Sequence, residues 1–424
     1  MSCVSTTRVR LARITGALAA FAAVMALSAP QVAGGQAAPG AVTFAKDVAP
    51  ILYKNCVECH RPTMFAPMSL VTFEEARPWA RAIKQKVVKR EMPPWTADAP
   101  AGTFRNDPRL SQREIDTIVA WVDSGATRGN DRDMPSAPRF AEGWTIGKPD
   151  AIFTMTEDFK IPAEGTIPYQ YIRVPTNLTE DKWLQAIEIR PGNPALVHHV
   201  IASAQPADFG ANDERVAGRV GLGGITPNKP GVVTDPGVAR RLPANAEIIL
   251  QMHYTTNGAP ATDRTSIGVI YAKEPPKKVL GGGSVLTLNF TIPPGAESHE
   301  VKGTTTLNRE TTLIAMMPHM HMRGKDMTYI AHYPDGRSET LLSVPKYDFN
   351  WQLTYELAEP KVLPTGTSIE VIAHFDNSTK NLYNPDPAAT VRWGDQTWEE
   401  MMIGFFTTLV DVPTPRPPTA QQQE

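Results

Sequence analysis

The sequence predicts a multidomain chain in which a small all-α unit precedes two antiparallel β-sandwich units. Its 424 residues exceed the length of a usual single domain. Its 39 prolines and 30 glycines favour loop-rich β structure over long helices in most of the chain. The hydrophobic period changes from helical spacing before residue 125 to short strand-like runs after residue 145. The helical unit is therefore expected first, and the β units after it.

The N-terminal residues are typical of an export signal. Three arginines precede an apolar run over residues 14–27, which ends near small residues. The run is too short to span a bilayer comfortably, and no other stretch approaches about 20 apolar residues. We expect residues 1–37 to be a signal peptide, so the mature protein would be periplasmic or secreted, without stable membrane insertion.

A helical unit is expected over residues 41–128. Helical patterns cover residues 44–52, 74–90 and 110–122, and the last of these starts with a capping box. The polar stretch that follows is rich in Asp, Arg, Gly and Pro and predicts a linker over residues 129–145.

Cys56, Cys59 and His60 form the pattern Cys-x-x-Cys-His. This is the attachment pattern of c-type haem, in which two thiols bind the haem covalently and the histidine is the proximal ligand. A disulfide and a thioredoxin-like redox pair are the alternatives, but neither needs the histidine, and the flanks have no βαβ pattern. Residues 41–128 therefore resemble a small class I cytochrome c domain, with haem c as cofactor.

The second axial haem ligand is expected to be Met92. It follows a helical stretch and precedes two prolines, which would hold it in a fixed loop. Met64 and Met68 follow His60 so closely that the chain could hardly bring them to the opposite haem face. Met134 lies beyond the last helical segment. Core packing, the commoner use of methionine, is the alternative for Met92.

Two β units are expected, over residues 146–275 and 276–412. Their strand-like segments are rich in Val, Ile and Tyr and are separated by Pro, Gly and Asn. In chain order these segments are residues 169–174, 183–189, 197–202, 247–254, 279–290, 311–315, 327–333, 351–357, 368–375 and 400–409. Residues 205–244 have little periodicity and are expected to be an ordered loop, whereas residues 413–424 are expected to be a disordered tail.

His319 and His321 are the first candidate metal ligands. Side chains two apart in an extended strand lie on the same face, so the pair can hold one ion without bending the backbone. Several methionines surround the pair, and a thioether favours copper over zinc, whereas imidazole suits both. Two ordinary strand histidines among core methionines are the alternative interpretation.

His198, His199 and His253 are the second candidate group. Adjacent residues of a regular strand face opposite sides, so His198 and His199 can share an ion only at a strand end or an irregularity. One core histidine and one surface histidine are the alternative. Three further histidines have no partner at ligand spacing and are expected to be structural: His299, His332 and His374.

Taken together, these histidines resemble those of the copper type II monooxygenases, the family of peptidylglycine α-hydroxylating monooxygenase and dopamine β-monooxygenase, over roughly residues 143–412. The resemblance implies two copper ions, one held by His198, His199 and His253 and the other by His319, His321 and Met401. Met402 is the alternative to Met401, and it would lie on the opposite strand face. Gln251, two residues before His253, also matches the family.

The family resemblance implies two jelly-roll domains that face each other across a cleft. The copper held by His319, His321 and Met401 would bind O₂ and abstract hydrogen, and the other copper would store and deliver an electron. The same resemblance gives Gln251 a catalytic role. An ascorbate-like reductant or a redox protein would supply electrons, and the haem would relay them.

The expected substrate pocket departs from the peptidylglycine enzymes. Met317 stands where they carry a carboxylate-binding arginine, and Ile403 and Phe405 stand where they carry asparagine and tyrosine. Without the arginine, the bidentate clamp for a carboxylate is lost. A peptide C-terminus is therefore not the expected substrate. The mature chain also has no cysteine for the disulfides of the animal enzymes.

These observations predict an exported haem–copper monooxygenase that hydroxylates a C–H bond of a small organic substrate with O₂. The alternatives are a non-catalytic periplasmic copper and haem electron-transfer protein, and a copper oxidase or peroxidase. The formal net charge of −2 gives no reason to expect nucleic acid as a partner.

Overall fold

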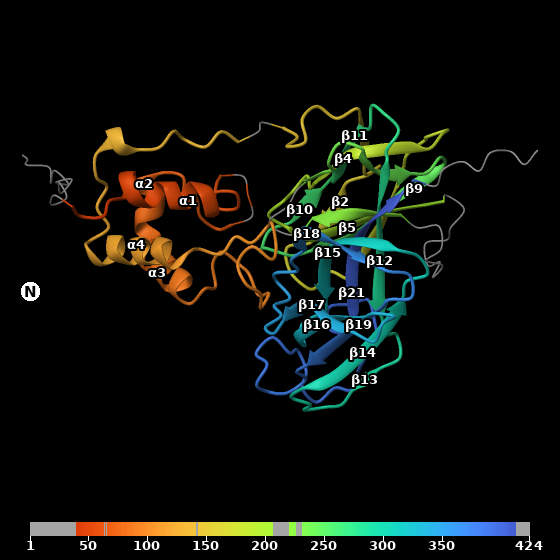
Figure 1. Ribbon diagram of the computed structural model, residues 1–424. Coiled ribbons are helices and arrows are strands. Elements are labelled where there is room, and N and C mark those ends of the chain that lie inside the picture. Colours follow the sequence, from red (N-terminus) through yellow and green to blue (C-terminus); the bar gives the residue numbers. More distant parts are fainter. Residues whose placement is uncertain are drawn as a thin grey trace, which may run out of the picture.

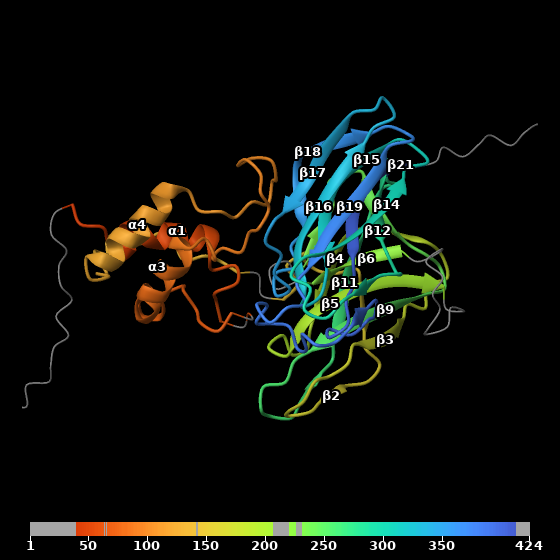
Figure 2. The ribbon, with the colours of Figure 1, turned by 90° about the horizontal axis from the view of Figure 1, so that it is seen from below.

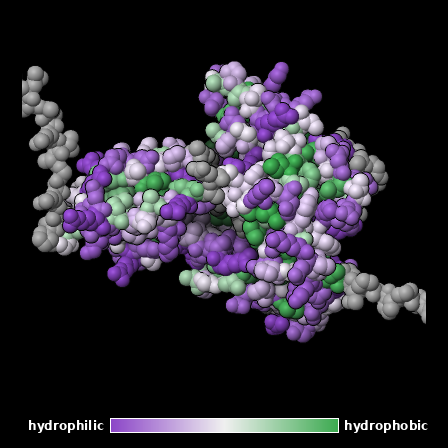
Figure 3. Space-filling view, turned by 90° about the horizontal axis from the view of Figure 1, so that it is seen from above, coloured by the Kyte–Doolittle hydropathy of each residue, from purple (hydrophilic) through white to green (hydrophobic). Residues whose placement is uncertain are grey.

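The computed structural model describes residues 40–62, 64, 66–140, 143–206, 220–225 and 231–412. The expected signal peptide and the expected disordered tail lie outside these described residues. The chain forms a helical lobe beside a larger β body (Figures 1 and 2). The space-filling view shows the same two parts, with hydrophilic side chains over much of the helical lobe (Figure 3).

The helical lobe is made of short helices. They are η1 (Phe44–Val48), α1 (Ala49–Asn55), α2 (Phe73–Ala76), η2 (Arg77–Trp79), α3 (Ala80–Val88), α4 (Gln112–Asp123) and η3 (Asp131–Asp133). Ser111 and Glu114 form the expected capping box at the start of α4. Phe44 and Trp121 are fully buried in the small apolar core between these helices. Among the described residues, no helix is long and apolar enough to cross a membrane.

Residues 95–106, here called the strap, leave the helical lobe between α3 and α4 and join the β body. Trp95 packs against Tyr355, with ring centroids 4.9 Å apart. Phe104 forms an isolated antiparallel bridge with Leu357. The aromatic side chains of the strap therefore belong to a β core and not to the core of the helical lobe.

The β body begins with strands β1 (Ala151–Thr154), β2 (Phe159–Ile161), β3 (Gln170–Pro175), β4 (Lys182–Arg190), β5 (Val197–Pro206), β6 (Val220–Ile225), β7 (Gly231–Val233), β8 (Val238–Leu242), β9 (Ala246–Tyr254), β10 (Ala261–Asp263) and β11 (Ser266–Tyr271). It continues with β12 (Lys278–Leu286), β13 (Thr291–Ile292), β14 (His299–Thr306), β15 (Thr311–His319), β16 (Gly324–His332), β17 (Ser338–Val344), β18 (Tyr355–Leu363), β19 (Ser368–Phe375), β20 (Val391–Arg392) and β21 (Ile403–Asp411). Residues 205–244, expected to be a loop, thus contain β6, β7 and β8.

One nine-stranded sheet runs through the whole β body. Its order is β1-β11-β4-β8-β12-β21-β15-β18, with β7 paired to β4. The parallel pairing of β8 with β12, through Val238 with Lys278 and Ala239 with Val279, joins the two halves. A four-stranded sheet covers each half: β3-β9-β5-β6 in the first and β14-β19-β16-β17 in the second.

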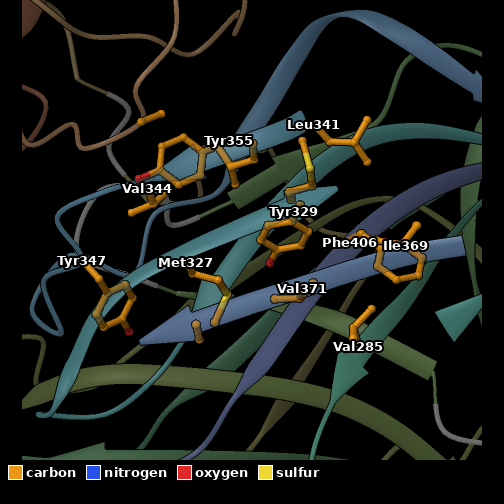
Figure 4. Packing of buried hydrophobic residues seen from close by; sticks show 14 of the residues in the cluster. Val285, Met327, Tyr329, Leu341, Val344, Tyr347, Tyr355, Ile369, Val371 and Phe406 are labelled. Atoms are coloured by element: carbon orange, nitrogen blue, oxygen red, sulfur yellow. The ribbon is translucent and has the colours of Figure 1, made fainter. Parts of the chain in front are cut away.

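Each half has its own apolar core between the large sheet and its four-stranded sheet. In the second half, Tyr329 and Val371 of the small sheet meet Val285 and Phe406 of the large sheet (Figure 4). The strap's Trp95 adds to this core. The alternating burial of β9 and β19 shows the period of two that buries one face of each strand.

The fold class expected from the sequence is wrong. The molecule is predominantly β-sheet, its α-helices are only 4 to 12 residues long, and the described residues show no small all-α cytochrome c domain. The physical reason is the strap, because the chain between α3 and α4 completes a β core instead of closing an independent helical globule. The β units also differ from two separate sandwiches, since they share one hydrogen-bonded sheet.

Candidate metal centre

Three histidines converge on the face of β5 and β9 that points away from the core of the first half. The nitrogen atoms of His198, His199 and His253 that can bind a metal all lie within 4.8 Å of one another. His199 is directly opposite His253 in the antiparallel pair, so the two side chains share a face. The structure therefore brings together the three histidines that the sequence proposed as one group.

A strand irregularity brings His198 to the same place as His199. The register between β5 and β9 shifts between Val197 and His199, so His198 is an extra residue in the ladder. A β-bulge of this kind re-aims a side chain that would otherwise face the opposite side. The Nδ1 atoms of the two histidines are 3.2 Å apart. The departure from regular strand geometry that an adjacent pair requires is thus present.

Two nitrogens of this group are buried and have no hydrogen-bond partner among the described residues: His199 Nε2 and His253 Nδ1. A buried polar atom without a partner is costly, and it usually marks a functional role or an absent ion or water. These atoms are neutral imidazole nitrogens, which are the common ligands of copper and zinc. The donor set therefore fits a metal ion.

His319 and His321 lie at one end of β15. His319 is the last residue of the strand and His321 lies in the short connection to β16, so the pair does not belong to one continuous strand as expected. Their ring centroids are still 5.3 Å apart. His321 Nε2 is a further buried nitrogen without a partner among the described residues.

Hydrogen bonds orient both rings of this pair. His319 Nδ1 is 2.6 Å from Gln352 Oε1, and His321 Nδ1 is 3.1 Å from the carbonyl oxygen of Glu399. Both partners accept hydrogen bonds, so each Nδ1 carries the proton and donates it. Each Nε2 is left with its lone pair, which is the state that a metal ligand requires.

Met401 and Met402 lie in the chain just before β21. Ile403 pairs directly with His319, so residues with the parity of Ile403 extend the face that carries His319. Met401 has this parity. Met402 has the opposite parity and lies in the apolar core of the second half, with 0% exposure. Burial of Met402 in this core leaves Met401 as the candidate third ligand, and its ligand role stays a prediction.

The two groups of histidines are neighbours at the junction of the two halves. The Tyr169 ring centroid lies 4.9 Å from that of His253 and 6.3 Å from that of His321. The Phe349 ring is 6.2 Å from each of the same two rings. Two aromatic side chains therefore lie between the groups and contact both.

Burial makes these histidines hard to protonate. It lowers the pKa of His253 and of His321 to about 3, and neighbouring histidines add to both shifts. The pKa of His199 is also lowered, first by burial and then by His253 and His198. All three side chains are thus neutral and able to bind a metal at any pH near 7.

Gln251 lies two residues before His253 on the same face of β9. Its Nε2 donates to Tyr171 Oη at 2.8 Å, and that hydroxyl donates to Asp395 Oδ2 at 3.1 Å. Gln251 therefore belongs to a hydrogen-bonded contact between the first half and the loop that leads to Met401. Its catalytic role stays a prediction.

The Cys-x-x-Cys-His pattern begins at the C-terminal end of α1. Cys56 and Cys59 are free thiols, and burial raises their pKa to about 12 and about 11 respectively. His60 Nδ1 lies 3.3 Å from the carbonyl oxygen of Met68, which leaves Nε2 as the nitrogen for an axial bond. The two free thiols and the His60 ring nitrogen are the groups that haem attachment would use, and the attachment stays a prediction. Met92 lies half-buried just before the strap, and its ligand role stays a prediction.

Two of the three histidines that were expected to be structural lie on the outer face of the β14-β19-β16-β17 sheet. His374 Nδ1 is 2.7 Å from Asp326 Oδ1, and His332 Nε2 is 3.0 Å from Glu370 Oε2. Pairing with surface carboxylates explains both. His299, the first residue of β14, is neither at the metal centre nor part of these pairs.

Several residues of the site have no local sequence signal. Tyr169, Phe349 and Gln352 are remote in sequence from every histidine that they contact and have no ligand spacing. Glu400 belongs to the acidic segment directly before Met401, a segment that supported the choice of Met401, but the sequence assigned no role to Glu400 itself.

The chain matches no known protein-family model and no curated protein. Among solved structures, it is similar to the major capsid protein P2 of bacteriophage PM2, with 7% identity over 62% of this chain and 98% of that chain and a TM-score of 0.26. It is also similar to allantoicase of Saccharomyces cerevisiae, with 10% identity over 52% of this chain and 80% of that chain and a TM-score of 0.16. Likenesses at these scores carry no argument about function.

Proposed function

We propose that the protein is an exported copper monooxygenase that hydroxylates a C–H bond of a small organic substrate with O₂. The observation that carries the proposal is the pair of neighbouring histidine groups with buried nitrogens that lack partners: His199 Nε2, His253 Nδ1 and His321 Nε2. Bound copper would supply the one-electron chemistry that O₂ activation needs. The residues of the chain hold, orient and enclose the metal.

The choice of copper depends on the donor atoms. The first group offers three imidazoles. The second offers two imidazoles, and Met401, just before β21, is the expected thioether ligand. A thioether is a soft ligand that favours copper in its reduced form over zinc. The two groups would thus bind copper through different donor atoms, as expected for two copper ions with different roles.

The surface around His319 supports an apolar substrate. Met317 pairs with Phe405 on the strand face that carries His319 and Ile403. The Phe405 ring centroid is 6.1 Å from that of His319. None of these neighbours offers a cation to bind a carboxylate. A hydrocarbon or aromatic C–H bond fits this surface better than a peptide C-terminus does.

The proposal includes haem c at Cys56, Cys59 and His60, with Met92 as the second axial ligand. When bound, haem c supplies a one-electron carrier that is covalently fixed to the chain. The external donor would be an ascorbate-like reductant or a redox protein. The expected signal peptide supports a location in the periplasm or outside the cell.

The test of the metal assignment is His319→Ala. We expect the wild-type protein to bind two copper ions per chain and the variant to bind one, with loss of hydroxylation and an unchanged haem spectrum. Metal analysis and product detection with labelled O₂ measure these outcomes. Full activity in the variant would remove His319, His321 and Met401 as the oxygen site.

Oxygen consumption separates the proposed enzyme from the other classes of protein. A monooxygenase consumes O₂ in proportion to the hydroxylated product and only when an organic substrate is present. An oxidase or peroxidase would reduce O₂ or peroxide without hydroxylating anything. An electron-transfer protein would bind both cofactors and change only its redox state.

A further inference from the structure

A buried carboxylate binds the backbone of the loop that carries His321. Glu400 Oε2 accepts a hydrogen bond from the His321 N–H at 2.9 Å, and Oε1 accepts one from the Arg323 N–H at 2.7 Å. Glu400 is 0% exposed. Both carboxylate oxygens are thus used by the loop between β15 and β16.

The same two chain segments are joined by further hydrogen bonds. The Arg323 side chain is buried, and its Nη1 donates to the carbonyl oxygen of Trp398 at 2.8 Å. Its Nε donates to Asn377 Oδ1, also at 2.8 Å. His321 Nδ1 donates to the Glu399 carbonyl oxygen. Residues 321–323 and 398–400 are therefore held together at several points, with Glu400 making two of the bonds.

We propose that Glu400 is a positioning residue that sets the place of His321 relative to Met401, the next residue in the chain. The inference rests on the proposed copper function of this group. The two oxygens of one side chain hold two residues of the loop, so the loop cannot shift relative to Glu400 without breaking a hydrogen bond. The ligands are then in place before a metal arrives, which lowers the cost of binding.

The amide of glutamine tests this role with almost no change in volume. In Glu400→Gln one oxygen is replaced by an NH₂ group, which would face a backbone N–H donor. One of the two hydrogen bonds is therefore lost, and the loop or Met401 must shift. In Glu400→Asp the carboxyl group is kept, but the side chain is one methylene shorter and cannot reach both N–H groups.

Glu188 provides the matched control. It lies on β4 in the first half, is 1% exposed, and also accepts a backbone hydrogen bond, from Ile146 N at 3.1 Å. Glu188→Gln makes the same change to a buried carboxylate that is not part of the metal centre. It separates a general loss of stability from an effect on His321 and Met401.

The experiment measures copper(I) binding to the full protein by competition with a coloured chelator, together with X-ray absorption at the copper edge. We expect Glu400→Gln to weaken one of the two sites by about 10- to 100-fold, the range found when the partners of metal ligands are changed. The sulfur contribution from Met401 should also be lost, while the other site stays unchanged. Glu188→Gln should keep both sites and the sulfur contribution.

Unchanged affinity and an unchanged sulfur contribution in folded Glu400→Gln would overturn the positioning role. Equal weakening of both sites would also overturn it, because that pattern indicates general destabilisation. If Glu400→Gln does not fold, the same criteria apply to Glu400→Asp. Backbone hydrogen exchange at His321 and Arg323 in the metal-free protein tests the positioning role of Glu400 separately from the proposed copper function. Faster exchange in the variant supports the hydrogen bonds of Glu400 even if the wild type binds no copper there, a result that would count against the proposed function alone.

Discussion

Two consecutive methionines with opposite surroundings allow a test at the scale of single residues. Met401 lies just before β21 and is not part of the second core, whereas Met402 is packed in that core. We expect Met402→Ala to lower the free energy of unfolding by about 2–5 kcal/mol, as for other buried methionines, with copper binding retained at low denaturant. Met401→Ile should weaken copper binding and oxygen chemistry more than folding.

Urea denaturation and copper titration of the two variants check this prediction. If copper binding is lost in folded Met402→Ala and kept in Met401→Ile, the ligand is Met402 and not Met401.

The neutral histidines also predict how stability depends on pH. Burial lowers the pKa of His253 and His321 to about 3, whereas an unfolded chain has a histidine pKa of about 6.5. Between these values the unfolded state binds more protons, so acidification favours unfolding. Each histidine adds a slope of about 1.4 kcal/mol per pH unit, and the stability that is complete above about pH 6.5 is lost as the pH falls toward 3.

Urea denaturation of the metal-free protein between pH 7 and pH 4 measures this slope. His253→Phe should reduce the slope of the unfolding free energy against pH by the contribution of one histidine. A stability that does not change over this range would show that the histidines are solvated.

At the scale of elements, the strap gives a prediction about the second core. Trp95 is 9% exposed and packs against Phe104 and Tyr355. We expect Trp95→Ala to lower the free energy of unfolding of the β body by about 3–5 kcal/mol, because a large buried aromatic side chain is removed. Trp79→Ala, at a residue that is 42% exposed, should change it by less than about 1 kcal/mol. Denaturation followed by far-ultraviolet circular dichroism measures the unfolding free energy of both variants. If Trp95→Ala changes it as little as Trp79→Ala does, the strap lies on the surface of the β body without stabilising its core.

Sequence patterns predicted the grouping of the candidate metal ligands better than they predicted the architecture. Spacing singled out His198, His199 and His253, which the structure brings together, because two of them are adjacent and all occupy strand-like segments. The pairing of β8 with β12 could not be predicted in this way. It depends on Val238 and Lys278, which lie 40 positions apart and carry no periodic signal of their own.

The strap was missed for the same reason. Its residues have no strong secondary-structure pattern, and their partners lie in β17 and β18, far along the chain. A local pattern cannot distinguish a loop of a helical domain from a segment that completes a distant core. The site residues Tyr169 and Phe349 likewise become recognisable only once the two halves are placed together.

At the scale of the whole molecule, the shared sheet predicts cooperative unfolding of the β body. The two halves are joined by backbone hydrogen bonds between β8 and β12 and by the contacts of Tyr171 and Asp395. We expect one thermal transition for both halves, with calorimetric and van't Hoff enthalpies that agree within error. Two resolved transitions in the β body would mean that the halves behave as independent domains.

The strap also determines the order in which the chain can reach its final state. Thr96 and Tyr355 are hydrogen-bonded although 259 positions separate them, and Asn106 bonds the Thr354 carbonyl across 248 positions. Synthesis proceeds from the N-terminus, so Trp95 and Phe104 emerge long before the strands that bury them. Until those strands are synthesised, the aromatic side chains of the strap stay exposed, and exposed apolar side chains promote aggregation. We therefore expect a truncation before β18 to be far less soluble than the full chain, because the aromatic side chains of the strap would have no core to enter.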